Sequence, residues 1–173
     1  VLWRVMGAAD KLPAGLGPCT HFELVTALAL VYFAEQAVDF AVIETGMGGL
    51  LDATNVIVPR VSAITAIQGE HRQFLGSTLE EIAAHKAGII KQGVPAVVLP
   101  QSSESVTEVF RATAERVDAP LTVVGVGNDF SLRLEASVEL GAHHKVNFKG
   151  QVLYLEHVTV PLKGEHQALN CGL

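Results

Sequence analysis

Residues 39–71 read DFAVIETGMGGLLDATNVIVPRVSAITAIQGEH, with apolar segments at 39–44 and 61–67 that each run directly into a polar loop. Neither segment alternates apolar with polar residues, as a strand with one solvent-facing side would. Unbroken apolar strands are typical of parallel sheets that are covered on both faces. The stretch therefore predicts two parallel strands whose exit loops, 45–55 and 68–76, lie at the ligand-binding edge of the sheet.

The flanking residues extend this pattern into an alternation of helices and strands. Residues 21–36 predict a helix buried on one side, through a face that carries Phe22, Val25, Leu28, Ala29 and Tyr32. Ser77 and Glu80 have the spacing of a capping box, which predicts a helix with Ser77 as its N-cap and an end near Ile89. Further strands are predicted at 96–99 and 121–124, and a further helix at 104–116. This alternation predicts an α/β fold, a doubly wound and mainly parallel sheet with helices on both faces.

The pattern changes beyond Phe130, where short segments alternate apolar and polar residues. Strands are predicted at 131–135, 145–148 and 152–156, and they indicate a small antiparallel β-subdomain. We expect one domain over 1–173, made of an irregular lead-in (1–20), an α/β core (21–127), the antiparallel sheet (128–163) and the start of a truncated helix (164–173). Because the chain begins at Val1 and stops just inside that helix, we expect a fragment of a longer protein.

Composition excludes several classes of protein. The chain has 12 Lys plus Arg against 18 Asp plus Glu, a net charge of −6, which argues against binding nucleic acid through its phosphates. No apolar stretch is long enough to span a membrane, so no membrane partner is expected. Cys19 and Cys171 form no CxxC pair, which speaks against a disulfide framework or a zinc site and favours a reducing, cytoplasmic setting.

Polar groups after the first predicted strand are candidates for holding a ligand. Glu44 ends that strand, where a carboxylate without a partner is costly, and Mg²⁺ would suit it; a helix cap or a surface lysine would serve as well. Gly46, Gly48 and Gly49 allow a sharp turn or a close approach of the backbone to a ligand. The segment is not a G-x-x-x-x-G-K-[ST] phosphate loop, and no other segment of the chain has that pattern.

His71, Lys86 and the pair His143-His144 allow both functional and structural interpretations. His71 follows the second predicted strand and is a candidate metal ligand, although a lone histidine is more often a hydrogen-bonded loop residue. Lys86 lies in mid-helix among apolar neighbours, where desolvation favours a reactive neutral amine; the simpler interpretation is a lysine whose stem packs while its amine reaches water. His143 and His144 are expected in a solvated turn.

Three segments together resemble the central domain of folylpolyglutamate synthase/dihydrofolate synthase, in the Mur ligase superfamily. They are FELVTALALVYFAEQAVDFAVIETGMGGLLDATN, ITAIQGEHRQFLGSTLEEIAAHKAGIIKQGVPAVV and PLKGEHQALN, in the family's order. The resemblance implies a ligase that uses ATP to turn a carboxylate into an acyl phosphate, which the amine of glutamate then attacks. The implied acceptor is a folate or dihydropteroate, and the implied cofactor is Mg²⁺.

The resemblance also implies roles for individual residues. Glu44 and His71 match magnesium ligands, and Lys86 matches a lysine that is carbamylated and helps to position the metal. The implied nucleotide-binding and substrate-binding residues are Gly46, Gly48, Gly49, Asp52, Asn55, Gln167 and Asn170. Because the chain lacks a phosphate loop, we expect it to be inactive by itself and to need the missing N- and C-terminal portions of the same polypeptide.

The chain departs from the family at three positions next to these residues. Leu50 stands where the family has Arg, Glu70 where it has Asp, and His85 where it has Glu. An apolar side chain cannot replace a bidentate arginine, so a second interpretation stays open: a non-catalytic relative that acts as a binding or scaffold domain. A third is a peptidoglycan-precursor ligase, which the DATN motif after the paired glycines fits less well.

Overall fold

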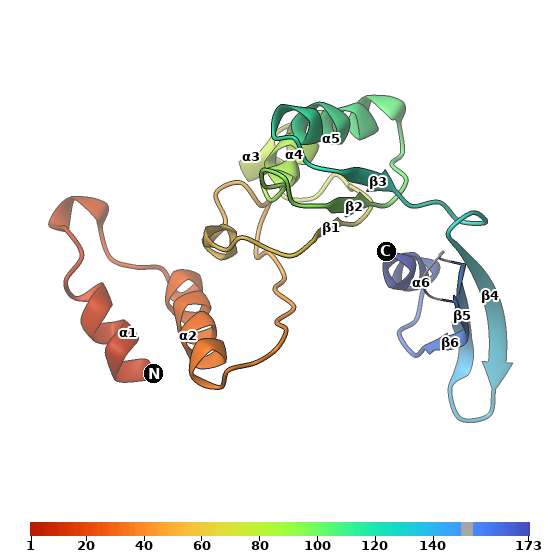
Figure 1. The fold of residues 1–173 in the computed structure, drawn as a ribbon, viewed down its shortest axis with the longest axis horizontal. Helices are drawn as coiled ribbons and strands as arrows, with labels where there is room; N and C mark the ends of the chain where they lie inside the picture. The colour runs from red at the N-terminus through yellow and green to blue at the C-terminus, as the bar shows by residue number, and fades with distance from the viewer. Residues whose placement is uncertain (150–153) are drawn as a thin grey trace. The chain divides into compact units, whose positions relative to one another are not determined.

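The chain is described by a computed structural model that covers residues 1–149 and 154–173. It divides into two compact units, Val1–Ile57 and Val58–Leu173, which we name unit 1 and unit 2 (Figure 1). None of the helices within the described ranges is both long and apolar enough to cross a membrane.

Unit 1 is built from helices and short helical turns. Its elements are α1 (Leu2–Ala9), the 3₁₀ turn η1 (Ala14–Leu16), α2 (His21–Glu35) and the 3₁₀ turn η2 (Ala53–Val56). The lead-in, expected to be irregular over 1–20, therefore contains α1. The prolines that suggested an irregular segment all come after this helix, at 13 and 18, and Val5 turns its side chain into the interior.

Thr20 and Glu23 fix the beginning of α2 through a capping box. Thr20 Oγ1 accepts a hydrogen bond from the Glu23 amide at 3.2 Å, and Glu23 Oε2 accepts one from the Thr20 amide at 2.6 Å. The backbone and then the hydroxyl of Thr20 lower the pKa of Glu23. The helix ends at Glu35, one residue before the predicted end.

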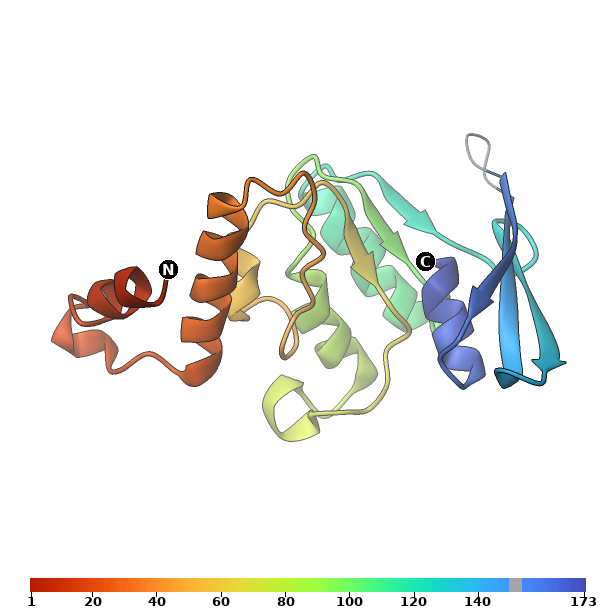
Figure 2. The ribbon, with the colours of Figure 1, turned by 90° about the horizontal axis from the view of Figure 1, so that it is seen from below.

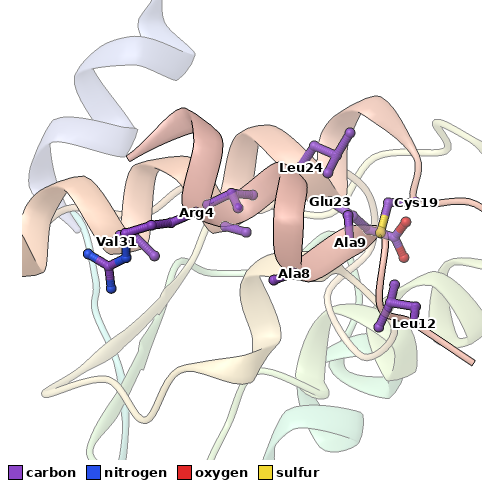
Figure 3. Close-up of a pocket in the computed structure, with 10 residues that line it drawn as sticks. Arg4, Ala8, Ala9, Leu12, Cys19, Glu23, Leu24 and Val31 are labelled. Atoms are coloured by element: carbon purple, nitrogen blue, oxygen red, sulfur yellow. The ribbon is translucent and has the colours of Figure 1, made fainter.

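The side of α2 that packs within unit 1 is not the predicted side. The predicted face stays largely exposed, by 42% at Phe22, 45% at Val25 and 51% at Tyr32. Leu24, Ala27 and Val31 instead line a groove of about 360 Å³ between α2 and α1 (Figure 3). Because α2 is apolar on nearly all sides, its sequence does not single out one buried stripe.

The strand predicted at 39–44 does not form. The backbone of unit 1 is described throughout, and within that unit there is no strand with which this segment is paired. Phe40 and Val42 are 84% and 99% exposed. The unbroken apolar pattern that suggested a buried strand is present in the sequence, but these side chains are not buried.

Unit 2 begins with a parallel sheet of three short strands. They are β1 (Ser62–Ile64), β2 (Ala96–Val98) and β3 (Leu121–Val123), in that order across the sheet. Each lies inside its predicted range, so these three predictions are confirmed. The amide of Leu99 donates to the Ile64 carbonyl at 3.0 Å, which continues the pairing of β1 with β2 just past the ends of both strands.

Helices cover one face of this sheet. The helices of this part of unit 2 are α3 (Arg72–Leu75), α4 (Leu79–Ala87) and α5 (Glu104–Arg116). α4 and α5 lie side by side on the sheet (Figures 1 and 2). Their apolar sides form the core of unit 2, in which Ile82, Val106 and Phe110 are fully buried together with Val98 of β2. α5 has the bounds that the sequence predicted.

The N-cap of α4 is Thr78 and not Ser77, so the helix begins one residue later than predicted. Thr78 Oγ1 accepts from the Glu81 amide and Glu81 Oε2 accepts from the Thr78 amide, both at 3.2 Å. The sequence STLEE contains the capping-box spacing twice, at 77/80 and at 78/81, and the pattern alone cannot choose between them. Ser77 donates its amide to the same Glu81 oxygen at 2.6 Å.

An antiparallel sheet follows β3 in unit 2. Its strands are β4 (Phe130–Ser137), β5 (Gly141–Lys149) and β6 (Tyr154–Val160). Residues 152 and 153 of the third predicted strand lie outside the described residues. Helix α6 (Glu165–Gly172) packs against this sheet (Figure 1), and Phe130, Val146 and Ala168 share a second core with Leu99. Of the predicted class, the α/β fold with a mainly parallel sheet and a small antiparallel sheet is confirmed, and the helices expected on the second face of a doubly wound sheet stay a prediction.

The surroundings of His143 differ from those predicted. It lies in β5 and is only 5% exposed, and its Nδ1 lies 3.0 Å from the Gly141 carbonyl oxygen. The turn that we expected here comes before it, at 138–140. His143 is therefore a buried strand residue with a local hydrogen bond.

Candidate active site

Asp52 organises the glycine-rich loop of unit 1. Its Oδ2 accepts hydrogen bonds from the amides of Gly46 at 3.0 Å and Met47 at 2.8 Å. Its Oδ1 accepts from the amide of Thr54 at 2.9 Å and from the Thr54 hydroxyl at 2.5 Å. Both oxygens thus close residues 46–54 into a compact loop, while the predicted contact of Asp52 with a nucleotide or substrate stays a prediction.

These hydrogen bonds control the ionisation of Asp52. Burial by itself raises the pKa of Asp52, but the bonds from Thr54, Met47 and Gly46 outweigh it and hold the pKa below its ordinary value. Because the pKa of Asp52 is lower in the folded state, the ionised carboxylate stabilises the fold, and this stabilisation is complete at neutral pH. It is lost as the pH falls through the lowered pKa.

A pH titration of this chain by NMR checks that geometry. The amide shifts of Gly46 and Met47 should follow the Asp52 carboxyl, with a midpoint below that of an ordinary aspartate. In Asp52→Asn the titration should vanish, and the loop should lose about 1–2 kcal/mol of stability, because a neutral amide accepts more weakly than a carboxylate. Asp39→Asn, at an exposed aspartate of the same unit, should leave the titration unchanged. A midpoint at or above the ordinary value would contradict the assignment.

The glycines of this loop meet two different steric demands. Gly48 has a φ of 68°, in the left-handed region that favours glycine. At Gly46 an added Cβ would lie 2.5 Å from the ring of Phe22, so a larger residue there would require this partly exposed ring to shift. Gly49, next to Gly48, is buried. The glycines therefore shape the loop, and their predicted contacts with a ligand stay predictions.

Glu44 stands just before the loop and is exposed. Since it does not end a strand, the cost of burying a carboxylate gives no argument for a metal at this residue. Leu50, where the resemblance leads one to expect arginine, is 50% exposed, and its carbonyl oxygen accepts a hydrogen bond from Asn55 Nδ2 at 2.9 Å. The loop keeps its shape without the arginine, and magnesium binding by Glu44 stays a prediction.

The second loop, in unit 2, leaves β1 and brings Glu70 next to Lys86. Lys86 Nζ lies 3.8 Å from Glu70 Oε1, and the two side chains are 22% and 56% exposed. Lys86 lies in the last turn of α4, not in mid-helix as we expected. The sequence marked Glu70 only as a departure from the family, so the pairing of its carboxylate with Lys86 was not predicted.

His71 follows Glu70 on the same loop. It is the N-cap of α3 with a φ of 52°, a conformation that is uncommon for residues other than glycine. Its carbonyl accepts hydrogen bonds from the amides of Phe74 at 2.9 Å and Leu75 at 3.0 Å, and the residue is exposed. The loop therefore places Glu70 beside Lys86 within unit 2, and His71 next to Glu70 along the chain. The convergence of Glu44, His71 and Lys86 stays a prediction.

Gln101, which the sequence did not single out, ties this loop to the end of β2. Its Oε1 accepts a hydrogen bond from the Ile67 amide at 2.9 Å. Its Nε2 donates to the Leu99 carbonyl at 2.6 Å and lies 3.5 Å from the Thr65 carbonyl. The signal that could have found it is its position as the first polar residue after a buried strand at the ligand-binding edge.

Gln167 and Asn170 lie on α6, which packs on the antiparallel sheet. Gln167 is half-buried and donates its amide to the Gly164 carbonyl at 3.1 Å, and Asn170 is exposed. Within residues 58–149 and 154–173, no hydrogen bond or ion pair joins either residue to the loop that carries Glu70 and His71. Their predicted role near the nucleotide stays a prediction.

A family model described as the Mur ligase middle domain matches residues 17–172. The chain belongs to this family. Both loops and α6 lie inside the matched region, so it contains every residue predicted for the site. The resemblance to folylpolyglutamate synthase/dihydrofolate synthase is confirmed as well, because relatives with these names match most of this Mur ligase middle domain.

Three relatives illustrate the similarity of this Mur ligase middle domain. It is 40% identical over 158 residues to the dihydrofolate synthase/folylpolyglutamate synthase of Bacillus subtilis, covering 91% of the chain and 36% of that relative. The folylpolyglutamate synthase structure from Thermotoga maritima matches with a TM-score of 0.77 and 32% identity, over 98% of the chain and 37% of that structure. A structure described as an FPGS–AMPPCP–folate complex matches with a TM-score of 0.80 and 33% identity, over 99% and 39%. The chain thus spans less than half the length of the relatives it matches.

The carboxylates of Glu44, in unit 1, and of Glu70, in unit 2, each suit Mg²⁺ by their chemistry, because Mg²⁺ prefers oxygen ligands. The imidazole nitrogen of His71 suits Mg²⁺ less well. All three residues are exposed. Across residues 1–149 and 154–173, no three His, Cys, Asp or Glu side chains already stand close enough together to hold a metal. A magnesium ion would therefore keep water or phosphate oxygens among its ligands, as Mg²⁺ usually does.

Proposed function

We propose that this Mur ligase middle domain is part of an ATP- and Mg²⁺-dependent ligase that adds glutamate to a folate or to dihydropteroate. The observation that carries the proposal is the approach of Lys86 to Glu70, on the loop that also carries His71. This loop leaves the carboxyl end of β1, the edge at which α/β sheets bind ligands. The names of the relatives, and the structure described with AMPPCP and folate, support the choice of substrates.

The proposal includes a longer polypeptide, which we name the parent polypeptide. The chain spans 36% of its Bacillus subtilis relative, and its 173 residues contain no G-x-x-x-x-G-K-[ST] loop. We infer that the parent polypeptide supplies the phosphate-binding loop and the glutamate-binding side, and that the 173-residue chain is inactive by itself. A cytoplasmic location is also part of the proposal, because Cys19 and Cys171 are free thiols, as in a reducing compartment.

The proposed reaction has two steps. The acceptor carboxylate takes the γ-phosphoryl group of ATP and releases ADP, and the amine of glutamate then displaces phosphate to form the amide. Bound Mg²⁺ supplies neutralisation of the phosphate charge during transfer. Glu44, Glu70 and His71 would hold the Mg²⁺ ion in place. The loop of Gly46, Gly48 and Gly49 would bring backbone amides close to the nucleotide.

Lys86 has two possible states in this scheme. As an amine it pairs with Glu70 and keeps that carboxylate beside α4. As a carbamate, formed when CO₂ adds to neutral Nζ and one proton is released, it becomes a second negative group next to Glu70. Two neighbouring anions favour a divalent cation between them, so carbamylation would complete the magnesium site.

An assay of ADP release tests the proposal. Over repeated turnovers, the parent polypeptide should release ADP only when folate or dihydropteroate and glutamate are both present, and Glu44→Ala and His71→Ala should abolish its magnesium binding in a titration. The 173-residue chain should release no ADP above a Lys86→Ala control. ADP release that is independent of both substrates would refute the ligase assignment, and turnover by the short chain would refute its dependence on the parent polypeptide.

The departures from the family favour a second function. Leu50, Glu70 and His85 replace groups that the resemblance places around the metal, and a relative that had lost catalysis could persist as a binding or scaffold domain. Two observations weigh against it: the loop holds its shape around Leu50, and Glu70 still supplies a carboxylate beside Lys86. Magnesium binding by the parent polypeptide without any ADP release would favour the scaffold.

A further inference from the structure

We propose that Gln101 is a positioning residue that fixes the loop of residues 65–71 to the end of β2 and thereby sets the places of Glu70 and His71. The tether stands on the geometry of unit 2 alone. Its relevance to the reaction rests on the proposed function, because that function assigns magnesium binding to the loop.

Gln101 continues the pairing of β1 with β2 where the backbone stops doing so. The two strands pair through Ile64 and Val98, and one more bond joins the Leu99 amide to the Ile64 carbonyl. Beyond that point a side-chain amide takes over, since it carries one carbonyl acceptor and an NH₂ donor like the two halves of a peptide group. Gln101 uses both, toward the Ile67 amide and the Leu99 carbonyl.

Burial makes this tether costly to remove. Ile67 is 5% exposed and Leu99 is 1% exposed, so water has little access to the groups that Gln101 satisfies. A buried amide or carbonyl without a hydrogen-bond partner destabilises the fold, because in the unfolded chain the same group would be hydrogen-bonded to water. Deleting the Gln101 amide should therefore shift the Ile67 main chain and not leave it in place unpaired.

The loop is short enough to transmit that shift. Only three residues separate Ile67 from His71, and the Glu70 amide donates to the Gln68 carbonyl at 2.9 Å, which tightens the turn between them. His71 then begins α3 in its left-handed conformation, while Glu70 reaches toward Lys86 on α4. A displaced Ile67 would alter the direction of both side chains.

Two variants separate the donor from the acceptor. Gln101→Met keeps an unbranched chain of similar length and removes both hydrogen bonds. Gln101→Glu keeps the acceptor for Ile67, but its ionised carboxylate faces the Leu99 carbonyl; when protonated, the acid both donates and accepts, like the native amide. Gln92→Met, at an exposed glutamine of the same unit, is the matched control.

Hydrogen exchange at the Ile67 amide in the parent polypeptide tests the tether. Exchange, corrected for its intrinsic dependence on pH, should be about 10-fold faster in Gln101→Met and unchanged in Gln92→Met. In Gln101→Glu it should stay slow, because the carboxylate keeps the acceptor for the Ile67 amide. Native-like exchange in Gln101→Met would overturn the tether whether or not the protein is a ligase.

The effect on magnesium tests the positioning role. Gln101→Met should raise the Mg²⁺ concentration for half-maximal ADP release about 10-fold, while kcat at saturating Mg²⁺ changes less. Faster exchange without any change in the magnesium requirement would overturn the positioning role and leave Gln101 as a structural tether. A parent polypeptide that shows the exchange effect but no substrate-dependent turnover would instead refute the proposed function.

Discussion

In the parent polypeptide, Lys86→Met should lower the rate of substrate-dependent ADP release roughly 10²–10³-fold, the range found when one preorganised polar group is removed from an active site. The side chain of Lys86 is 22% exposed, so methionine can fill the same space. The substitution removes the amine that stands 3.8 Å from Glu70, which is the only ion-pair partner of this carboxylate in the described part of the chain. Loss of either state of Lys86, amine or carbamate, has this effect.

Two further variants test whether the loss of rate is specific to Lys86. Lys149→Met, at an exposed lysine of β5, should leave the rate unchanged. Lys86→Arg keeps a positive charge for Glu70 but forms no stable carbamate, so it should be as slow as Lys86→Met if the carbamate is required and should recover part of the rate if the ion pair suffices. Full activity of Lys86→Met would remove Lys86 from the proposed site.

Phe110→Ala should lower the free energy of unfolding of unit 2 by about 3–5 kcal/mol, the usual effect of removing a buried phenylalanine ring. Phe110 is 0% exposed and lies in the core that α5 shares with α4 and the parallel sheet. Urea-induced unfolding followed by circular dichroism measures this change. Fluorescence does not replace it, because the single tryptophan, Trp3, lies in unit 1.

Phe74→Ala is the matched control for this deletion. Phe74 lies on α3 in the same unit but is 63% exposed, so removing its ring should cost less than about 1 kcal/mol. Similar losses at both positions would mean that the ring of Phe110 is not packed as the structure describes.

The sequence predicts the elements of unit 2 well because their signals are local. The bounds of α5 follow from its spacing of apolar residues, and β1, β2 and β3 follow from unbroken apolar segments between turns. The same apolar signal is misleading at 39–44, since a strand needs a neighbour and the sequence cannot say whether one is present. The N-cap of α4 is wrong by one residue because Ser77 and Thr78 have the same spacing to a following glutamate.

The candidate site could be predicted as a set of motif residues but not as a set of contacts. The resemblance identifies Asp52 and Asn55 as site residues, but only the structure shows that both form hydrogen bonds within their own loop. The pairing of Glu70 with Lys86 joins an exit loop to the last turn of a helix, and nothing local in the sequence encodes that distance. For Gln101 the only signal in the sequence is its place as the first polar residue after a buried strand, and this position alone does not indicate its hydrogen-bond partners.

Leu99 sits at a point where two cores meet. Its side chain is buried with Phe130 and Ala168 in the core of the antiparallel sheet and α6, while its carbonyl is held by Gln101 and its amide by Ile64 of the parallel sheet. Leu99 thus links the antiparallel sheet and α6 to the parallel sheet and, through Gln101, to the loop of residues 65–71. A substitution that displaces the Leu99 backbone should therefore affect both α6 and this loop.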